Sequence, residues 1–163
     1  MDWLKKIFGK DEPKKIKVNT KVAKSFIFEG LKETYQFLTS DAIGRDLINT
    51  FSMDKLIALD FLTIYISAKN EWGTSTTSRI ISSMIKKMES LYNNDSLAVD
   101  YSHKTKLKEH YFNCKKLYSK SGEEVLFTNL FDSKNPETNK NLKKYFKMHL
   151  ELAQHMIDLV AKY

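Results

Sequence analysis

The stretch KLIALDFLTIYISAK, residues 55–69, decides the predicted fold. It is the most apolar segment of the chain, and its apolar side chains would lie around almost the whole circumference of a helix. Such a helix has to be surrounded by other elements. The alternation around Leu62, Ile64 and Ile66 is also typical of a strand, but the run is too long for an average strand. We therefore predict an all-α helical bundle of about six or seven helices, with a central apolar helix near residues 54–70.

A polar stripe interrupts this predicted central helix. Asp60, Thr63 and Ser67 follow one another at spacings of three and four, which aligns them along one side of a helix. Because burying an unpaired carboxylate is costly, we interpret the stripe as the place where the helix meets water. The alternative is a polar slot in which these three residues face a partner or a ligand.

Length and composition favour one helical domain. A chain of 163 residues is long enough to bury a hydrophobic core without disulfides or bound metals. Five Gly and two Pro are few for an architecture of strands and turns. We expect residues 1–13 to form a short amphipathic segment and hinge, and residues 14–163 to form a single all-helical domain. The single cysteine and the lack of a signal peptide or membrane-length apolar run favour a cytoplasmic location.

The first ten residues have the pattern of an amphipathic helix. Apolar residues lie on one side and lysines mostly on the other: Trp3, Leu4, Ile7 and Phe8 against Lys5, Lys6 and Lys10. We interpret this segment as docking onto the core of the protein, or onto a partner or second subunit. The alternative is an anchor at an anionic membrane surface, which would be the inner face of a membrane.

Lysine accounts for most of the formal charge of +7. A basic face is predicted on a helix near residues 103–120, with Lys104, Lys108, Lys115 and Lys116 as its candidates for binding an anion or nucleic acid. Tyr111 and Phe112 could add base stacking there. The chain has only two arginines among 27 basic residues, and arginine makes most specific phosphate and base contacts. We therefore interpret this face as an ordinary solvated surface.

Trp72 lies in the most loop-like stretch, which we predict between Asn70 and Ser78. A tryptophan in such a loop more often folds back over the core than stands out as a partner anchor. The partner-anchor role stays open as the alternative.

Three residues could ligate a metal. His110 and Cys114 are one helical turn apart, with His103 seven residues before His110, but structural zinc needs four ligands and no second Cys or nearby Cys/His pair completes the set. His149 lies in the apolar stripe of a predicted helix at residues 136–162, together with Leu152 and Met156. We interpret His149 as a hydrogen-bonded core residue, with haem or metal ligation as the alternative. No cofactor is expected.

No phosphate-binding loop, dinucleotide fingerprint or nucleophile elbow occurs in the sequence. We therefore expect a non-enzymatic protein-protein interaction module, such as a small helical adaptor, inhibitor, immunity-type or chaperone-like protein. Its partner would be another protein or a second copy of the chain. The alternatives are a peripheral membrane protein anchored by residues 1–10 and a non-specific nucleic-acid-binding protein.

Overall fold

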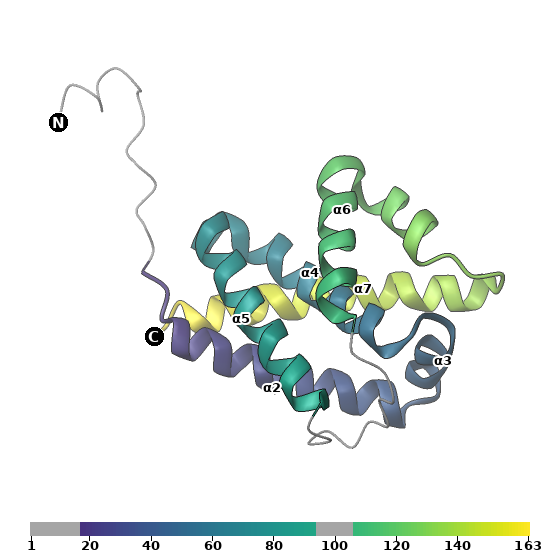
Figure 1. Ribbon diagram of the computed structural model, residues 1–163, viewed down its shortest axis with the longest axis horizontal. Helices are drawn as coiled ribbons and strands as arrows, with labels where there is room; N and C mark the ends of the chain where they lie inside the picture. The colour runs from purple at the N-terminus through teal and green to yellow at the C-terminus, as the bar shows by residue number, and fades with distance from the viewer. Residues whose placement is uncertain (1–16, 94–105) are drawn as a thin grey trace.

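The computed structural model describes residues 17–93 and 106–163, with side chains described as far as residue 91 in the first range. Six helices and no strands are found within these residues (Figure 1). They are α2 (Thr20–Ser40), α3 (Ala42–Phe51), α4 (Met53–Trp72), α5 (Thr74–Asn93), α6 (Leu107–Leu130) and α7 (Pro136–Val160). The prediction of an all-α bundle of about six helices is confirmed.

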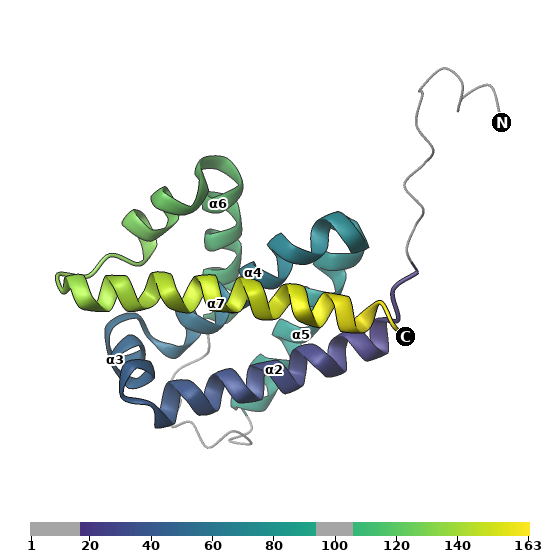
Figure 2. The ribbon, with the colours of Figure 1, turned by 180° about the vertical axis from the view of Figure 1, so that it is seen from behind.

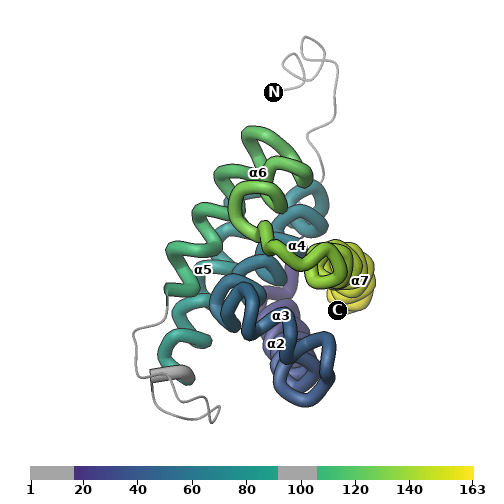
Figure 3. Tube along the Cα trace, turned by 90° about the vertical axis from the view of Figure 1, so that its right-hand side faces the viewer, coloured from purple at the N-terminus to yellow at the C-terminus, as the bar shows by residue number. Residues whose placement is uncertain are grey.

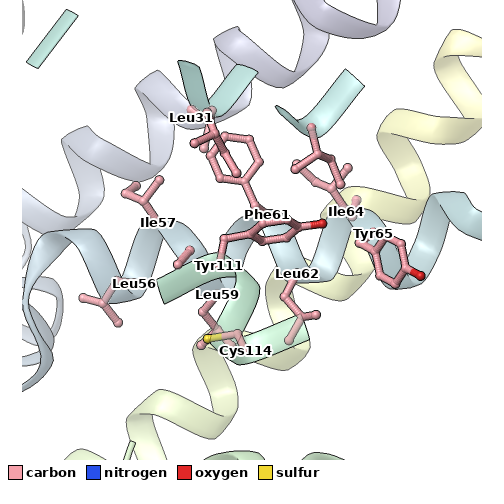
Figure 4. Close-up of a cluster of buried hydrophobic side chains, with 14 of the residues drawn as sticks. Leu31, Leu56, Ile57, Leu59, Phe61, Leu62, Ile64, Tyr65, Tyr111 and Cys114 are labelled. Atoms are coloured by element: carbon pink, nitrogen blue, oxygen red, sulfur yellow. The ribbon is translucent and has the colours of Figure 1, made fainter. Parts of the chain in front are cut away.

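Helix α4 is the central helix that residues 55–69 predict. Every side chain from Leu56 to Tyr65 is buried, and α4 packs against α3, α5, α6 and α7. Seen along the bundle, α4 lies between α7 on one side and α5 and α6 on the other (Figure 3). In the core, the ring of Phe61 meets Tyr111 of α6 edge-on at 6.3 Å (Figure 4).

Side-chain caps start four of the helices at polar residues. Asp41 accepts a hydrogen bond from the backbone N–H of Ile43 at 2.8 Å, and Asn135 accepts one from Glu137 at 3.0 Å. Asn19 and Ser52 cap α2 and α4 in the same way. Because these oxygens satisfy backbone donors that have no partner within the helix, the caps define where the helices begin.

The predicted loop between Asn70 and Ser78 is wrong. Helix α4 continues to Trp72, and α5 begins at Thr74 after a single residue. That residue is Gly73, whose φ of +82° is accessible to glycine at little cost, so one residue suffices for the turn. Trp72 is 7% exposed and belongs to the core, so it is not available as a surface anchor for a partner.

Helix α6 joins two segments that the sequence pattern separates. A kink at Gly122, with φ +83°, changes the direction of the chain in the middle of the helix. The residues after the kink then approach the first half of α7 (Figure 1), where the rings of Phe127 and Phe146 meet at 5.2 Å. This kink shapes the space between α6 and α7.

Several sequence predictions concern residues outside the described ranges. These are the amphipathic segment, with Trp3, Leu4, Lys5, Lys6, Ile7, Phe8 and Lys10, and the candidate Lys104. Within the described residues, no helix combines the length and the hydropathy that a bilayer-spanning segment requires.

Candidate functional site

A groove runs between α2 and α7, with α4 as its floor. The two helices run antiparallel and converge where α2 begins and the chain ends (Figure 2), and there the rings of Phe26 and Tyr163 are 6.0 Å apart. The groove has a volume of about 520 Å³. Its apolar lining comes from Phe26, Ile27, Leu31, Phe37, Ile64, Met148, Leu152, Ala153, Met156 and Leu159. We refer to it as the α2–α7 groove.

Two apolar side chains stand open to solvent at the mouth of the α2–α7 groove. Leu152 is 53% exposed and Met148 is 43% exposed, although the spacing of Leu152 places it in the apolar stripe of α7. The pattern predicts burial for Leu152, but α2 and α7 diverge here and leave its side chain uncovered. Large apolar groups that stay exposed beside a concave apolar surface are typical of a binding site.

Three polar residues from three different helices meet at the floor of the groove. Thr34 of α2, Asp60 of α4 and His149 of α7 are all buried. Thr34 Oγ1 lies 3.1 Å from His149 Nε2 and 3.5 Å from Asp60 Oδ2, and His149 Nε2 lies 4.0 Å from Asp60 Oδ1. The hydroxyl of Thr34 therefore sits between the imidazole and the carboxyl group.

A contact with the backbone determines which ring nitrogen of His149 carries the hydrogen. Its Nδ1 lies 2.8 Å from the carbonyl oxygen of Tyr145, which can only accept, so Nδ1 carries the hydrogen. In the neutral ring Nε2 then accepts from the Thr34 hydroxyl. In the protonated ring Nε2 donates to Thr34, and Thr34 can donate onward to Asp60. The Thr34 hydroxyl thus connects the His149 imidazole with the Asp60 carboxyl group.

Burial raises the pKa of the Asp60 carboxyl above its usual value, while the charge of His149 and hydrogen bonds from Thr63 and Thr34 partly offset this. Thr63 is itself fully buried and donates to the backbone carbonyl of Asp60 at 2.6 Å. The interpretation that this stripe meets water is therefore wrong for Asp60 and Thr63. Asp60 faces inward because Thr34 of α2 and His149 of α7 supply polar partners, whereas the Thr63 hydroxyl bonds to Asp60 within α4. Of the three stripe residues only Ser67 is partly exposed.

The predicted lysine-rich face of α6 is only partly available. Lys108 and Lys116 are exposed, but Lys115 is half-buried, with its Nζ 4.5 Å from the centre of the Tyr65 ring and 3.5 Å from Ser78 Oγ. Of the two aromatic residues expected to stack with bases, Tyr111 is buried and Phe112 is 46% exposed. Among the described members of this face, Lys108, Lys116 and Phe112 are exposed, whereas Lys115 is half-buried and Tyr111 is buried.

The His110–Cys114 pair lacks the character of a metal site. The Cys114 thiol is buried, and burial raises its pKa to about 12, which disfavours the thiolate that binds metals. Burial and the nearby charge of Lys55 lower the pKa of His110. In the part of the chain that the structure describes, no three His, Cys, Asp or Glu side chains are grouped so that they could hold a metal ion.

Thr34 is the groove residue that sequence reasoning missed. It occupies a buried position of α2 between Leu31 and Leu38, at the helical spacing of three and four that also marks a core-facing stripe. A polar residue inside an apolar stripe is the signal that singles out His149 in α7. Applied to α2, the same signal would have found Thr34.

The whole chain was also compared with known proteins. No family model, curated protein sequence or solved structure matches it.

Proposed function

We propose that the protein is a non-enzymatic interaction module whose α2–α7 groove accommodates an amphipathic helix of another protein. The observation that supports this most directly is the apolar groove of about 520 Å³ with Leu152 and Met148 exposed at its mouth. Helices recognised in this way place their apolar face into a hydrophobic groove. The burial of Leu152 and Met148 by a partner would supply part of the binding energy.

The dimensions of the groove suit a helical segment of about three turns. Its lining spans twelve residues along α2, from Phe26 to Phe37, and twelve along α7, from Met148 to Leu159. At 1.5 Å per residue each wall is roughly 18 Å long. An amphipathic helix presents anchors at positions i, i+3 or i+4, and i+7 over that length.

The charges and side-chain types that line the α2–α7 groove indicate which partner helices would bind it. Glu29 and Glu33 border the groove along α2, so lysines or arginines beside the apolar anchors of a partner would be attracted. Met148 and Met156 supply flexible, polarisable contacts that can adapt to different anchor shapes.

A designed peptide tests the proposed groove binding. Its helix would carry leucines at i, i+4 and i+7 and lysines beside them, with a fluorescent label for anisotropy measurements. We expect Leu152→Glu to weaken binding by at least about tenfold, because it places a charge where an apolar anchor is desolvated. Amide shifts in NMR spectra of the full chain should map to α2 and α7.

The control is Ile43→Glu, which changes an apolar residue of α3 that is 47% exposed and does not line the groove. We expect it to leave peptide affinity within about twofold of the parent protein, since it removes no groove contact. Equal weakening by the two variants, or shifts that map away from α2 and α7, would contradict groove binding.

Other sequence-based roles stay predictions. We propose a cytoplasmic location, because the one thiol is buried and the sequence shows no sign of dependence on disulfides. Membrane attachment through residues 1–10, assembly with a second copy of the chain and nucleic-acid binding are the alternatives to this proposal.

A further inference from the structure

A second concave surface lies on the opposite edge of α7 from the α2–α7 groove. Between the first half of α7 and the part of α6 that follows the kink is a cleft of about 730 Å³. Four exposed lysines of α7 line it: Lys140, Lys143, Lys144 and Lys147. Of the described residues that line this cleft, Glu123 is the only acidic one. We call it the basic cleft.

The four lysines concentrate positive charge without internal compensation. They stand at helical positions i, i+3, i+4 and i+7, where like charges on one face repel each other. They also lie in the N-terminal half of α7, towards the positive end of the helix dipole. The ion pairs found among the described side chains join Lys32 to Glu29 and His149 to Asp60, so none of the four is paired with an acid there.

The floor of the basic cleft is apolar, which concentrates the field of the lysines. Phe146 is 1% exposed and Leu150 is half-buried beneath the charged groups. A concave surface of one charge sign with low-dielectric walls attracts counter-ions more strongly than a flat surface does. The cleft therefore provides several cationic donors that line one concave surface.

The chemistry of the donors identifies the class of ligand. Lysine ammonium groups act as compact point charges without the planar fork of arginine, which suits dense phosphate charge rather than a single carboxylate. No exposed aromatic ring is present among the described residues that line the cleft, so stacking of nucleic-acid bases is not supported. We infer that the basic cleft binds a compact anion with several phosphate groups, either free in solution or as the headgroup of a lipid.

Calorimetry on the full chain tests this inference. Inositol hexakisphosphate is the probe for a free anion, and phosphatidylcholine vesicles with or without phosphatidylinositol bisphosphate are the probe for a headgroup. We expect the double variant Lys144→Glu and Lys147→Glu to weaken binding by at least about tenfold, because each lysine near a phosphate surface contributes separately. Glu123→Gln should tighten binding, since it removes the one acid.

The matched control is Lys108→Glu with Lys116→Glu, which makes the same change in net charge at exposed lysines of α6 outside the cleft. The cleft is supported if only the α7 double variant loses affinity for either probe, and the probe that binds identifies a free anion or a lipid headgroup. Equal losses in both double variants would overturn it, as would a single-stranded oligothymidylate that binds as tightly as the phosphate probes.

Discussion

At the scale of single residues, the most costly arrangement in this protein is the buried set of Thr34, Asp60 and His149. A carboxyl group in the core is tolerated only when other groups compensate its lost hydration. Here the compensation comes from a hydroxyl and an imidazole contributed by other helices. The same groups lie at the floor of the α2–α7 groove.

The pH dependence of stability should show the cost of Asp60. Because burial raises its pKa, the folded state holds the proton more tightly than the unfolded chain does. The resulting stabilisation is present in acid and is lost as the pH rises above the ordinary aspartate value of about 4. We therefore expect Asp60→Asn to gain stability relative to the parent protein between about pH 4 and pH 7, as measured by urea unfolding.

Each tenfold difference in the proton affinity of Asp60 between the folded and unfolded states corresponds to about 1.4 kcal/mol in the free energy of unfolding. Glu124→Gln serves as the control, because it removes an exposed carboxyl group of α6. Its stability should follow that of the parent at every pH. A relative loss of stability for Asp60→Asn as the pH rises would instead mean that the ion pair with His149 outweighs the cost of burial.

At the scale of helices, α2 and α3 meet at a backbone contact that leaves no room for a side chain. A methyl group added at Gly44 of α3 would collide with the backbone of Phe37 and Leu38 in α2. Gly30 of α2 has no atom within 4 Å of the same added group. The two glycines therefore have opposite roles, although both lie inside helices.

Alanine substitutions at these two glycines should change the free energy of unfolding in opposite directions. We expect Gly44→Ala to lower the free energy of unfolding by about 1–3 kcal/mol, because the backbone of α2 has to move. Gly30→Ala should raise it by roughly 0.5–1 kcal/mol, since alanine favours a helix and meets no obstacle. Chemical denaturation measures both, and a stabilised Gly44→Ala variant would contradict the close approach of α2 and α3.

At the scale of the whole molecule, α4 connects the bundle because it contacts α3, α5, α6 and α7. Its side chains belong to the same core cluster as residues of every other described helix. Truncation of a buried side chain of α4 should therefore weaken the packing of several helices at once. This arrangement favours cooperative unfolding of the described helices.

Phe61→Ala tests this role of α4. Phe61 is fully buried, so its removal should cost about 3–5 kcal/mol in lost burial and cavity formation. Unfolding followed by circular dichroism and by tryptophan fluorescence should remain coincident, because Trp72 belongs to the same core. Ile43→Ala, at an exposed position, should change stability by no more than about 0.5 kcal/mol.

Sequence alone determined the helical class, the central helix near residues 54–70 and the start of the last helix at residue 136. These features depend on residues within a few positions of one another, such as the all-round apolar pattern of residues 55–69 and the caps Asp41, Ser52 and Asn135. The predicted loop after Asn70 failed because its polar residues weaken a helical pattern without preventing a helix. One glycine was enough for the turn.

Only the tertiary structure decided which polar groups are buried and which surfaces are concave. Thr34 and His149 are separated by 115 positions, and no local pattern reveals that they meet above Asp60. Likewise, the lysines of α7 border a cleft because the kink at Gly122 places Glu123 of α6 on the other side of it. Periodicity predicts the face of a helix, but the neighbouring helices determine whether that face is buried, paired or open to a partner.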